Sequence, residues 1–164
     1  MNSGAALEAA RYLTPLFLPR VLEDELLTRA VLMFPERFLD REIAEHYPEL
    51  DGEERSSLMT FLAYNVRYEL HEHAQSRAMP LLRRTLPKAA CKRLRPLYGH
   101  VEIVGSAGGR YRIYAYGECV ERVFEHNGRW YGAVRYCYHD PLHVLCHADH
   151  ALAVALFLLA DEPG

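Results

Sequence analysis

The sequence has no long hydrophobic run, no pattern of a secretory leader and no C-x-x-C pair. Its longest apolar run, Ala151 to Leu159, is far shorter than the ~20 residues of a membrane-spanning helix. The N-terminus lacks a basic stretch ahead of an apolar one, so we expect a cytoplasmic protein without membrane contact. Four cysteines in 164 residues are too few for a disulfide scaffold, and reduced thiols are expected.

Recognisable catalytic motifs are also missing. The serines have no G-x-S-x-G context, and the glycine-rich stretch "GSAGG" at 105–109 precedes an expected strand rather than a helix. It therefore predicts a hairpin turn and not a phosphate-binding loop. These absences favour a non-enzymatic protein that needs no cofactor.

The composition predicts one globular domain, 1–164, with a helical part over 1–97 and a second part over 98–164. Half of the residues are hydrophobic and a quarter are charged, which fits a chain that buries a core. Apolar residues at helical spacing predict helices over 4–13, 15–33 and 35–46, with prolines at their boundaries. A longer helix is expected to begin at "DGEERSS", with a buried apolar stripe of Leu58, Phe61, Leu62, Val66 and Leu70. Another helix, interrupted near Pro87, is expected over 79–95.

From His100 the apolar spacing changes to every second residue. Four segments rich in β-branched and aromatic residues, ending near residue 138, predict a four-stranded antiparallel β-meander. Asn127-Gly128 predicts a tight turn between the last two strands, because both positions of a type I′ turn need positive φ. In the last strand, strict alternation would place Val134 and Tyr136 on one face and Tyr131, Arg135 and Cys137 on the other. One face is expected to be buried in the core and the other to be exposed.

The C-terminal segment predicts one more helix. Asp140 followed by Pro141 is typical of a helix start, so a helix is expected from there to about Ala160. Its apolar residues, Leu156 among them, surround the helix, which indicates burial on all sides. The predicted fold class is therefore α+β, with an N-terminal helical layer, a four-stranded antiparallel β-meander and a buried C-terminal helix.

The start of that helix carries a cluster of histidines, "HDPLHVLCHADH". His143, His147 and His150 fall on one helical face, and the first two have the spacing of a zinc-binding pair. Val144 stands where a metalloprotease has its catalytic glutamate, which argues against that chemistry. Histidines hydrogen-bonded at the edge of a core are the simpler interpretation, and zinc binding or a metal-dependent hydrolase is the alternative.

A second arrangement of metal-ligand residues spans the predicted meander. Cys119-Val-Glu121 is followed by Cys137-Tyr-His139 and then by a leucine- and alanine-rich helix. This order resembles the C-x-C…C-x-H plan of SWIM zinc-binding domains, with Glu121 in place of the second cysteine. The resemblance covers about residues 100–160 and implies interaction with nucleic acid or protein.

Charge is distributed unevenly along the chain. Acids outnumber bases between Glu23 and Glu54, whereas the stretch from Arg77 to Arg95 holds seven basic residues and no acid. We expect a binding or regulatory module in which the basic helix and the next β-ribbon contact an anionic partner.

An acidic protein is favoured over nucleic acid because the pI is near 6.3, although a helix followed by a basic hairpin resembles a winged helix. A homo-oligomer stays an open alternative. The residues expected to contact the partner are Arg83, Arg84, Lys88, Lys92, Arg93, Arg95, Arg110, Arg112, Tyr114 and Tyr116.

Overall fold

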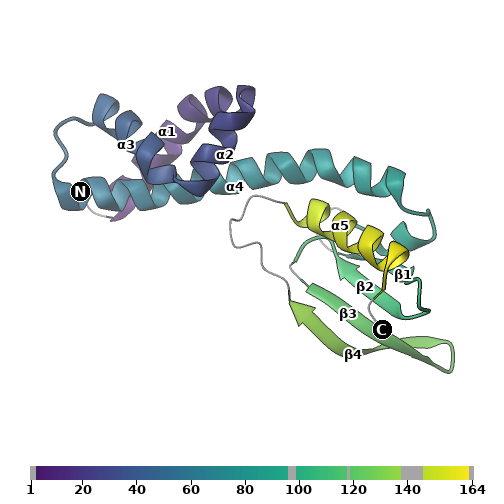
Figure 1. Cartoon of the computed structure of the whole chain (residues 1–164). Helices are drawn as coiled ribbons and strands as arrows, with labels where there is room; N and C mark the ends of the chain where they lie inside the picture. Colours follow the sequence, from purple (N-terminus) through teal and green to yellow (C-terminus); the bar gives the residue numbers. More distant parts are fainter. Residues whose placement is uncertain (1–2, 96–98, 118, 138–145, 163–164) are drawn as a thin grey trace. The chain divides into compact units, whose positions relative to one another are not determined.

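The computed structural model describes residues 3–95, 99–117, 119–137 and 146–162. It contains helices and a four-stranded antiparallel sheet that is followed by a C-terminal helix (Figure 1). The predicted α+β class is thereby confirmed. The chain forms two compact units, and the boundary between them lies after His73, within a helix. The expectation of a single domain stays a prediction.

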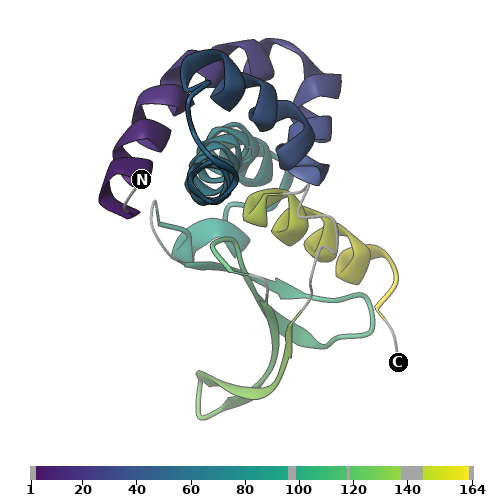
Figure 2. The same cartoon turned by 90° about the vertical axis from the view of Figure 1, so that its left-hand side faces the viewer.

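The first unit is a helical bundle. It consists of α1 (Ser3–Glu23), α2 (Glu25–Met33), α3 (Pro35–His46) and the first part of α4 (Gly52–Thr85). The view along α4 in Figure 2 shows the three shorter helices around it. The expected apolar stripe of α4 is fully or almost fully buried at Leu58, Leu62, Val66 and Leu70. This stripe and the inner faces of α1, α2 and α3 form the core of the unit.

The first helix is longer than predicted. We expected a boundary at Pro15, but α1 runs through both Pro15 and Pro19. Each proline removes one backbone hydrogen bond, yet both lie on the exposed side of α1, where water can satisfy the freed carbonyl groups. The opposite side is anchored in the core at intervals of four residues by Leu13, Phe17 and Val21.

Two aspartates fix the helix starts that the sequence left imprecise. Asp24 breaks the predicted helix 15–33, because its Oδ1 accepts hydrogen bonds from the backbone N–H of Leu26 and Leu27 at 2.9 and 3.1 Å. Asp51 Oδ1 accepts from the N–H groups of Glu53 and Glu54 at 3.0 and 2.9 Å at the start of α4. Both are N-caps that satisfy otherwise unpaired donors.

The predicted helix over 79–95 does not exist as a separate element. α4 continues through an exposed Pro80 to Thr85, and the rest of the segment forms only the short 3₁₀ helix η1 (Ala90–Arg93). The continuity has the same cause as in α1, because Ala78, Met79 and Leu82 are buried beside the proline.

The second unit contains the sheet, with strands in the order β1 (His100–Val104), β2 (Arg110–Tyr114), β3 (Cys119–His126) and β4 (Arg129–Cys137). All neighbours are antiparallel, which confirms the predicted meander. The turn between β3 and β4 has positive φ at Asn127 (52°) and Gly128 (71°), as predicted from the sequence.

The last strand departs from strict alternation. Arg122 pairs with Val134 and Val123 pairs with Gly132, so Ala133 is an extra residue in β4. Such a bulge reverses the faces of the residues that precede it. Tyr131 therefore shares a face with Val134, contrary to the prediction, and stacks on its cross-strand neighbour Phe124 at 5.7 Å between ring centroids. The expected buried face is also missing here, because residues 131–137 are all exposed.

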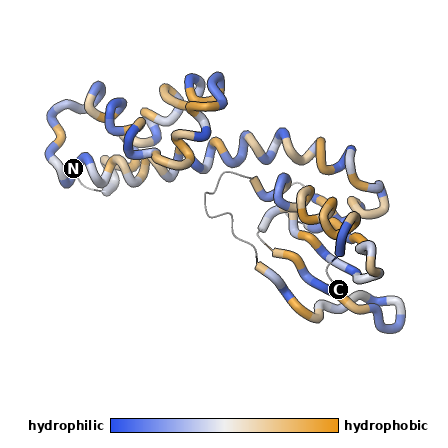
Figure 3. Tube along the Cα trace, in the orientation of Figure 1, coloured by the Kyte–Doolittle hydropathy of each residue, from blue (hydrophilic) through white to orange (hydrophobic). Residues whose placement is uncertain are grey.

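The C-terminal helix α5 (His147–Ala160) contacts β1 and β2 and covers one face of the sheet within this unit (Figure 1). Its expected start at Asp140 lies outside the described residues, and the described helix begins after the N-cap Cys146. Although α5 is hydrophobic along most of its length (Figure 3), only one side is buried. That side consists of Ala148, Ala151, Ala155 and Leu158. The prediction of burial on all sides was wrong, because Leu156, Phe157 and Leu159 are exposed.

No helix in the described part of the chain is long and apolar enough to cross a membrane.

Candidate functional site

The second unit has a net positive charge, whereas the first unit has a net negative charge. Residues 74–164 have twelve Lys and Arg against eight Asp and Glu, whereas residues 1–73 have seven against fourteen. Seven of the twelve bases lie between Arg77 and Arg95, where there is no acid. A candidate site for an anionic partner is therefore a property of this unit and not of the helical bundle.

We call the exposed residues of this segment the basic corner: Arg83, Arg84, Lys88, Lys92, Arg93 and Arg95. They lie on the last turn of α4, the following turn, η1 and, for Arg95, just after η1. Every fourth residue of the segment is buried in the core of the second unit, which anchors it and directs the intervening basic residues outward. The residues at this spacing are Ala78, Leu82, Leu86, Ala90 and Leu94.

Arg83 has a structural contact within the basic corner. Its guanidinium donates a hydrogen bond to the carbonyl oxygen of Leu94 at 3.4 Å and so connects α4 with the end of η1. It also lies near Cys91, whose thiol pKa is raised by burial and partly lowered by the Arg83 charge. Arg84, Lys88, Lys92 and Arg93 are exposed, and none has a carboxylate within 4 Å among the residues that the structure describes. These four cations are available to a partner.

The arginines expected to extend the site along β2 are instead paired inside the sheet. Arg110 forms a 2.6 Å ion pair with Glu125. Arg112 lies 3.5 Å from carboxylate oxygens of both Glu102 and Glu121. Each arginine therefore already has carboxylate partners on the neighbouring strands.

The register explains why these charges meet. Glu102 is opposite Arg112, which is opposite Glu121, which is opposite Arg135, so alternating charges cross all four strands. Directly opposite side chains lie on the same face of a sheet. We call this row the charge ladder. Gly132 makes room for it, since a Cβ there would collide with the Glu121 carboxylate.

The two tyrosines of the predicted site are similarly engaged. The Tyr114 hydroxyl donates to Glu121 at 3.4 Å, and burial followed by the Glu121 charge raises the Tyr114 pKa. The Arg135 guanidinium lies 5.8 Å from the centre of the Tyr114 ring. Tyr116 is half-buried and packs against the core of the unit. Their rings are not open platforms for stacking.

The histidine cluster is only partly within the described residues. His143 lies outside them, and His147 and His150 are half-buried in the first turn of α5. No group of three or more His, Cys, Asp or Glu side chains within the described ranges is arranged to hold a metal ion. Of the residues that carry the resemblance to SWIM domains, Cys119 and Cys137 are cross-strand partners and Glu121 belongs to the charge ladder. His139 lies outside the described residues.

Two buried polar residues, Gln75 and Glu162, organise the second unit, and neither was among the predicted site residues. Gln75 donates to the carbonyl oxygen of Ala115 at 2.7 Å and accepts from the N–H of Ala148 at 2.9 Å, so it connects α4, the end of β2 and α5. Glu162 accepts from the N–H groups of Ala107 and Gly109 at 2.8 and 3.2 Å. The glycine-rich turn that was predicted to be a hairpin therefore holds a carboxylate of the chain itself. In the sequence, the importance of Gln75 was indicated only by its being a polar residue at a position of α4 that faces the core.

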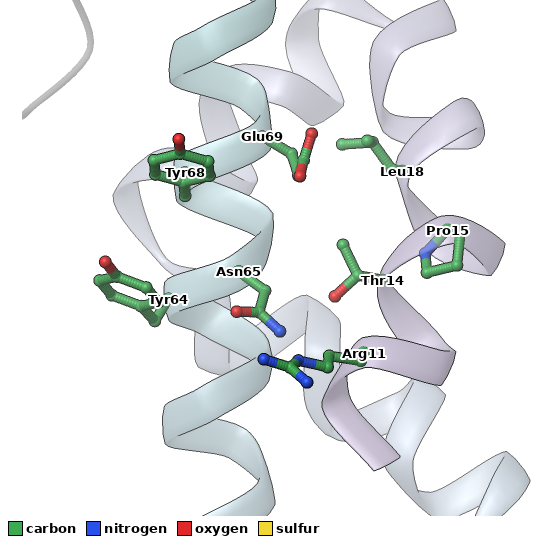
Figure 4. A pocket seen from close by; sticks show the side chains of 8 residues that line it. All are labelled: Arg11, Thr14, Pro15, Leu18, Tyr64, Asn65, Tyr68 and Glu69. Carbon is green, nitrogen blue, oxygen red and sulfur yellow. The ribbon is translucent and has the colours of Figure 1, made fainter. Parts of the chain in front are cut away.

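An open groove of about 530 Å³ lies in the first unit, between α1 and α4. Arg11 and Asn65 point toward each other across it, and Glu69 lies toward Leu18 (Figure 4). The groove belongs to the unit that lacks the basic corner.

Comparisons with protein-family models, with curated proteins and with solved structures find no match.

Proposed function

We propose that this protein is a non-enzymatic binding module that engages an acidic protein surface through the basic corner. The observation that carries the proposal is the group of four exposed cations, Arg84, Lys88, Lys92 and Arg93, on a segment without acids. Charges of one sign on a firmly anchored surface raise the rate of encounter with a partner of opposite charge.

The neighbouring side chains favour protein over nucleic acid. Leu81 is 40% exposed on the same stretch of α4, and protein interfaces combine apolar contacts with arginine. Nucleic-acid recognition would need further cations and aromatic platforms from the adjacent β-ribbon. There, Arg110 and Arg112 have carboxylate partners in the sheet.

The test compares two charge-reversed double variants of the full chain by affinity capture from cells of the source organism. Arg84→Glu with Lys92→Glu changes the basic corner and spares Arg83, which has a structural hydrogen bond. Arg41→Glu with Arg129→Glu makes the same change of net charge at exposed positions elsewhere. We expect acidic proteins captured by the wild type to be lost with the first variant and retained with the second, and captured amounts to fall as salt rises.

Nuclease treatment of the extract separates the two classes of partner. Capture that survives the treatment supports an acidic protein, whereas capture that disappears identifies nucleic acid as the ligand. The alternative metal function is tested with His143→Ala combined with His147→Ala. If this variant loses capture while the Arg84/Lys92 variant keeps it, the basic corner is not the functional surface.

A further inference from the structure

Cys119 and Cys137 lie directly opposite each other on β3 and β4. Directly opposite residues of antiparallel strands have Cα atoms about 4.5–5.5 Å apart, within the range of about 4.4–6.8 Å found for disulfides. Both side chains lie on the face that carries the charge ladder, because Glu121 and Arg135, each two residues away from the cysteine of the same strand, occupy that face. The two sulfurs are therefore on the same side of the sheet and within reach of each other.

We propose that Cys119 and Cys137 are a redox-active pair that forms a reversible cross-strand disulfide with a low-molecular-weight disulfide, such as oxidised glutathione, as the oxidant. The proposal is independent of the basic corner. The unequal exposure of the two thiols sets the order of the steps, since Cys137 is exposed whereas Cys119 is half-buried. An external oxidant reaches the exposed sulfur first.

In the first step the Cys137 thiol loses its proton, and its sulfur attacks one sulfur of glutathione disulfide. The S–S bond of the oxidant breaks, one glutathione thiolate leaves and takes up a proton, and a mixed disulfide remains on Cys137. In the second step the Cys119 sulfur, after losing its proton, attacks the Cys137 sulfur and expels the second glutathione. Two protein thiols are oxidised to one disulfide, and one glutathione disulfide is reduced to two thiols.

The surroundings of Cys119 suit it to this second step. Its burial raises the pKa of the thiol, and the nearby Arg135 guanidinium acts in the opposite direction. A thiol protected in this way reacts slowly with molecules in solution, but an attack within the hairpin benefits from the high effective concentration of two fixed sulfurs. Arg135 is thus a positioning residue, because it can stabilise the Cys119 thiolate without touching the oxidant.

The other two cysteines serve as internal controls. Cys146 is buried, its pKa is raised to about 11 by that burial, and its thiol donates to Asp149 at 3.3 Å. Cys91 is half-buried beside Arg83 in the basic corner. Neither belongs to the sheet, so neither is expected to enter the disulfide.

The experiment treats the full native chain with oxidised glutathione, blocks the remaining thiols and maps peptides without reduction. We expect the number of free thiols to fall from four to two, a peptide pair joined through Cys119 and Cys137, and recovery of all four thiols with dithiothreitol. Links through Cys91 or Cys146, disulfide-joined dimers, or a glutathione adduct that persists on Cys137 in the wild type would each overturn the proposal.

Three variants test the order of the steps. Cys119→Ser should accumulate the glutathione adduct on Cys137, Cys137→Ser should show neither adduct nor disulfide at Cys119, and Cys91→Ser should behave like the wild type. Arg135→Gln should slow the conversion of adduct into disulfide without changing the rate of adduct formation. Because the wild-type map alone decides which sulfurs are joined, the proposal remains testable even if a cysteine variant fails to fold.

The disulfide should also change the dynamics of the sheet. β4 is an edge strand, and the side chains of residues 131–137 are exposed, so backbone pairing with β3 contributes most of what holds it in place. A covalent link at the end of the hairpin opposes local opening. Hydrogen exchange of the β4 amides should slow by at least tenfold after oxidation, while exchange in α5 stays unchanged. Unchanged exchange in β4 would show that the link does not restrain the edge strand.

Discussion

The Tyr111 hydroxyl donates a 2.6 Å hydrogen bond to Glu162, a residue 51 positions later in the chain. The same carboxylate accepts two backbone N–H groups of the turn between β1 and β2, and its own N–H donates to the Ser106 hydroxyl. The end of α5 is thereby fixed to the sheet by polar contacts as well as by apolar packing. A Cβ at Gly109 would collide with both the Glu162 carboxylate and the Tyr111 hydroxyl.

This contact predicts a loss of stability at alkaline pH. Burial, followed by the hydrogen bond to Glu162, raises the pKa of Tyr111 to about 12, above the value of about 10 in an unfolded chain. The protonated hydroxyl therefore stabilises the fold fully below about pH 10, and this contribution declines as the pH rises toward 12. Urea unfolding from pH 8 to 11.5 should show the decline in the wild type. In Tyr111→Phe the part of this decline that is due to Tyr111 should be absent. The free energy of unfolding of this variant at pH 8 should already be about 1–2 kcal/mol lower than that of the wild type. Equal slopes in the two proteins would contradict the assignment.

Glu162 predicts the opposite dependence at acid pH. The hydrogen bond from Tyr111 is the main cause that lowers the Glu162 pKa. A carboxylate with a lowered folded pKa stabilises the protein above its unfolded pKa of about 4.3, and this contribution is lost as the pH falls through the folded value. Glu162→Gln should reduce the acid sensitivity of the melting temperature between pH 5 and 2. Glu125→Gln, which removes an exposed ion pair with Arg110, is the matched control and should change it little.

Gln75 should be needed for the stability of the second unit. Its amide satisfies the carbonyl of Ala115 and the N–H of Ala148, and all three residues are buried. Gln75→Leu keeps the size of the side chain but leaves both backbone groups without this partner, which should cost about 2–4 kcal/mol. Arg77 is exposed two residues further along α4, and Arg77→Ala should lower the free energy of unfolding by less than about 0.5 kcal/mol. Denaturant unfolding measures both, and a normally stable Gln75→Leu protein would show that water replaces the amide.

The elements of the fold could be predicted where local sequence decides the outcome. The Asn127-Gly128 turn, the alternating strands and the apolar stripe of α4 follow from backbone sterics and periodicity, which act over a few residues. The paths of α1 and α4 through Pro15 and Pro80 could not be predicted, because packing of side chains far apart in the chain outweighs the local cost of a proline. The bulge at Ala133 was missed for a similar reason, since pairing with β3 determines it.

The candidate site was predictable only in its charge content. The absence of acids between Arg77 and Arg95 indicated a group of exposed cations, and these side chains are exposed. Alternation along β2, in contrast, could not reveal that Arg112 pairs with acids of two neighbouring strands. Cross-strand register decides which charges neutralise each other. The same register places Cys119 opposite Cys137. Their separation along the chain alone could not predict this pairing.

Folding should not require a metal ion. The predicted ligands His147 and His150 lie at the start of a helix whose buried side is formed by Ala148, Ala151 and Leu158, so apolar packing can hold the helix by itself. We expect a strong chelator to shift the melting temperature by less than about 2 °C. A structural zinc ion contributes directly to the free energy of folding, so a decrease of many degrees, restored by added zinc, would contradict this expectation.

The two sides of α5 should respond very differently to an introduced charge. Leu158 is 6% exposed and belongs to the core of the second unit, whereas Leu156 is 45% exposed. Leu158→Asp places an unpaired carboxylate among apolar side chains and should destabilise by more than about 3 kcal/mol. Leu156→Asp makes the same chemical change on the same helix, and it should cost no more than about 1 kcal/mol because water still reaches the carboxylate. Chemical denaturation of both proteins, with circular dichroism as the probe, measures the difference. Similar large losses in both would show that α5 is buried on all sides, as its composition alone had suggested.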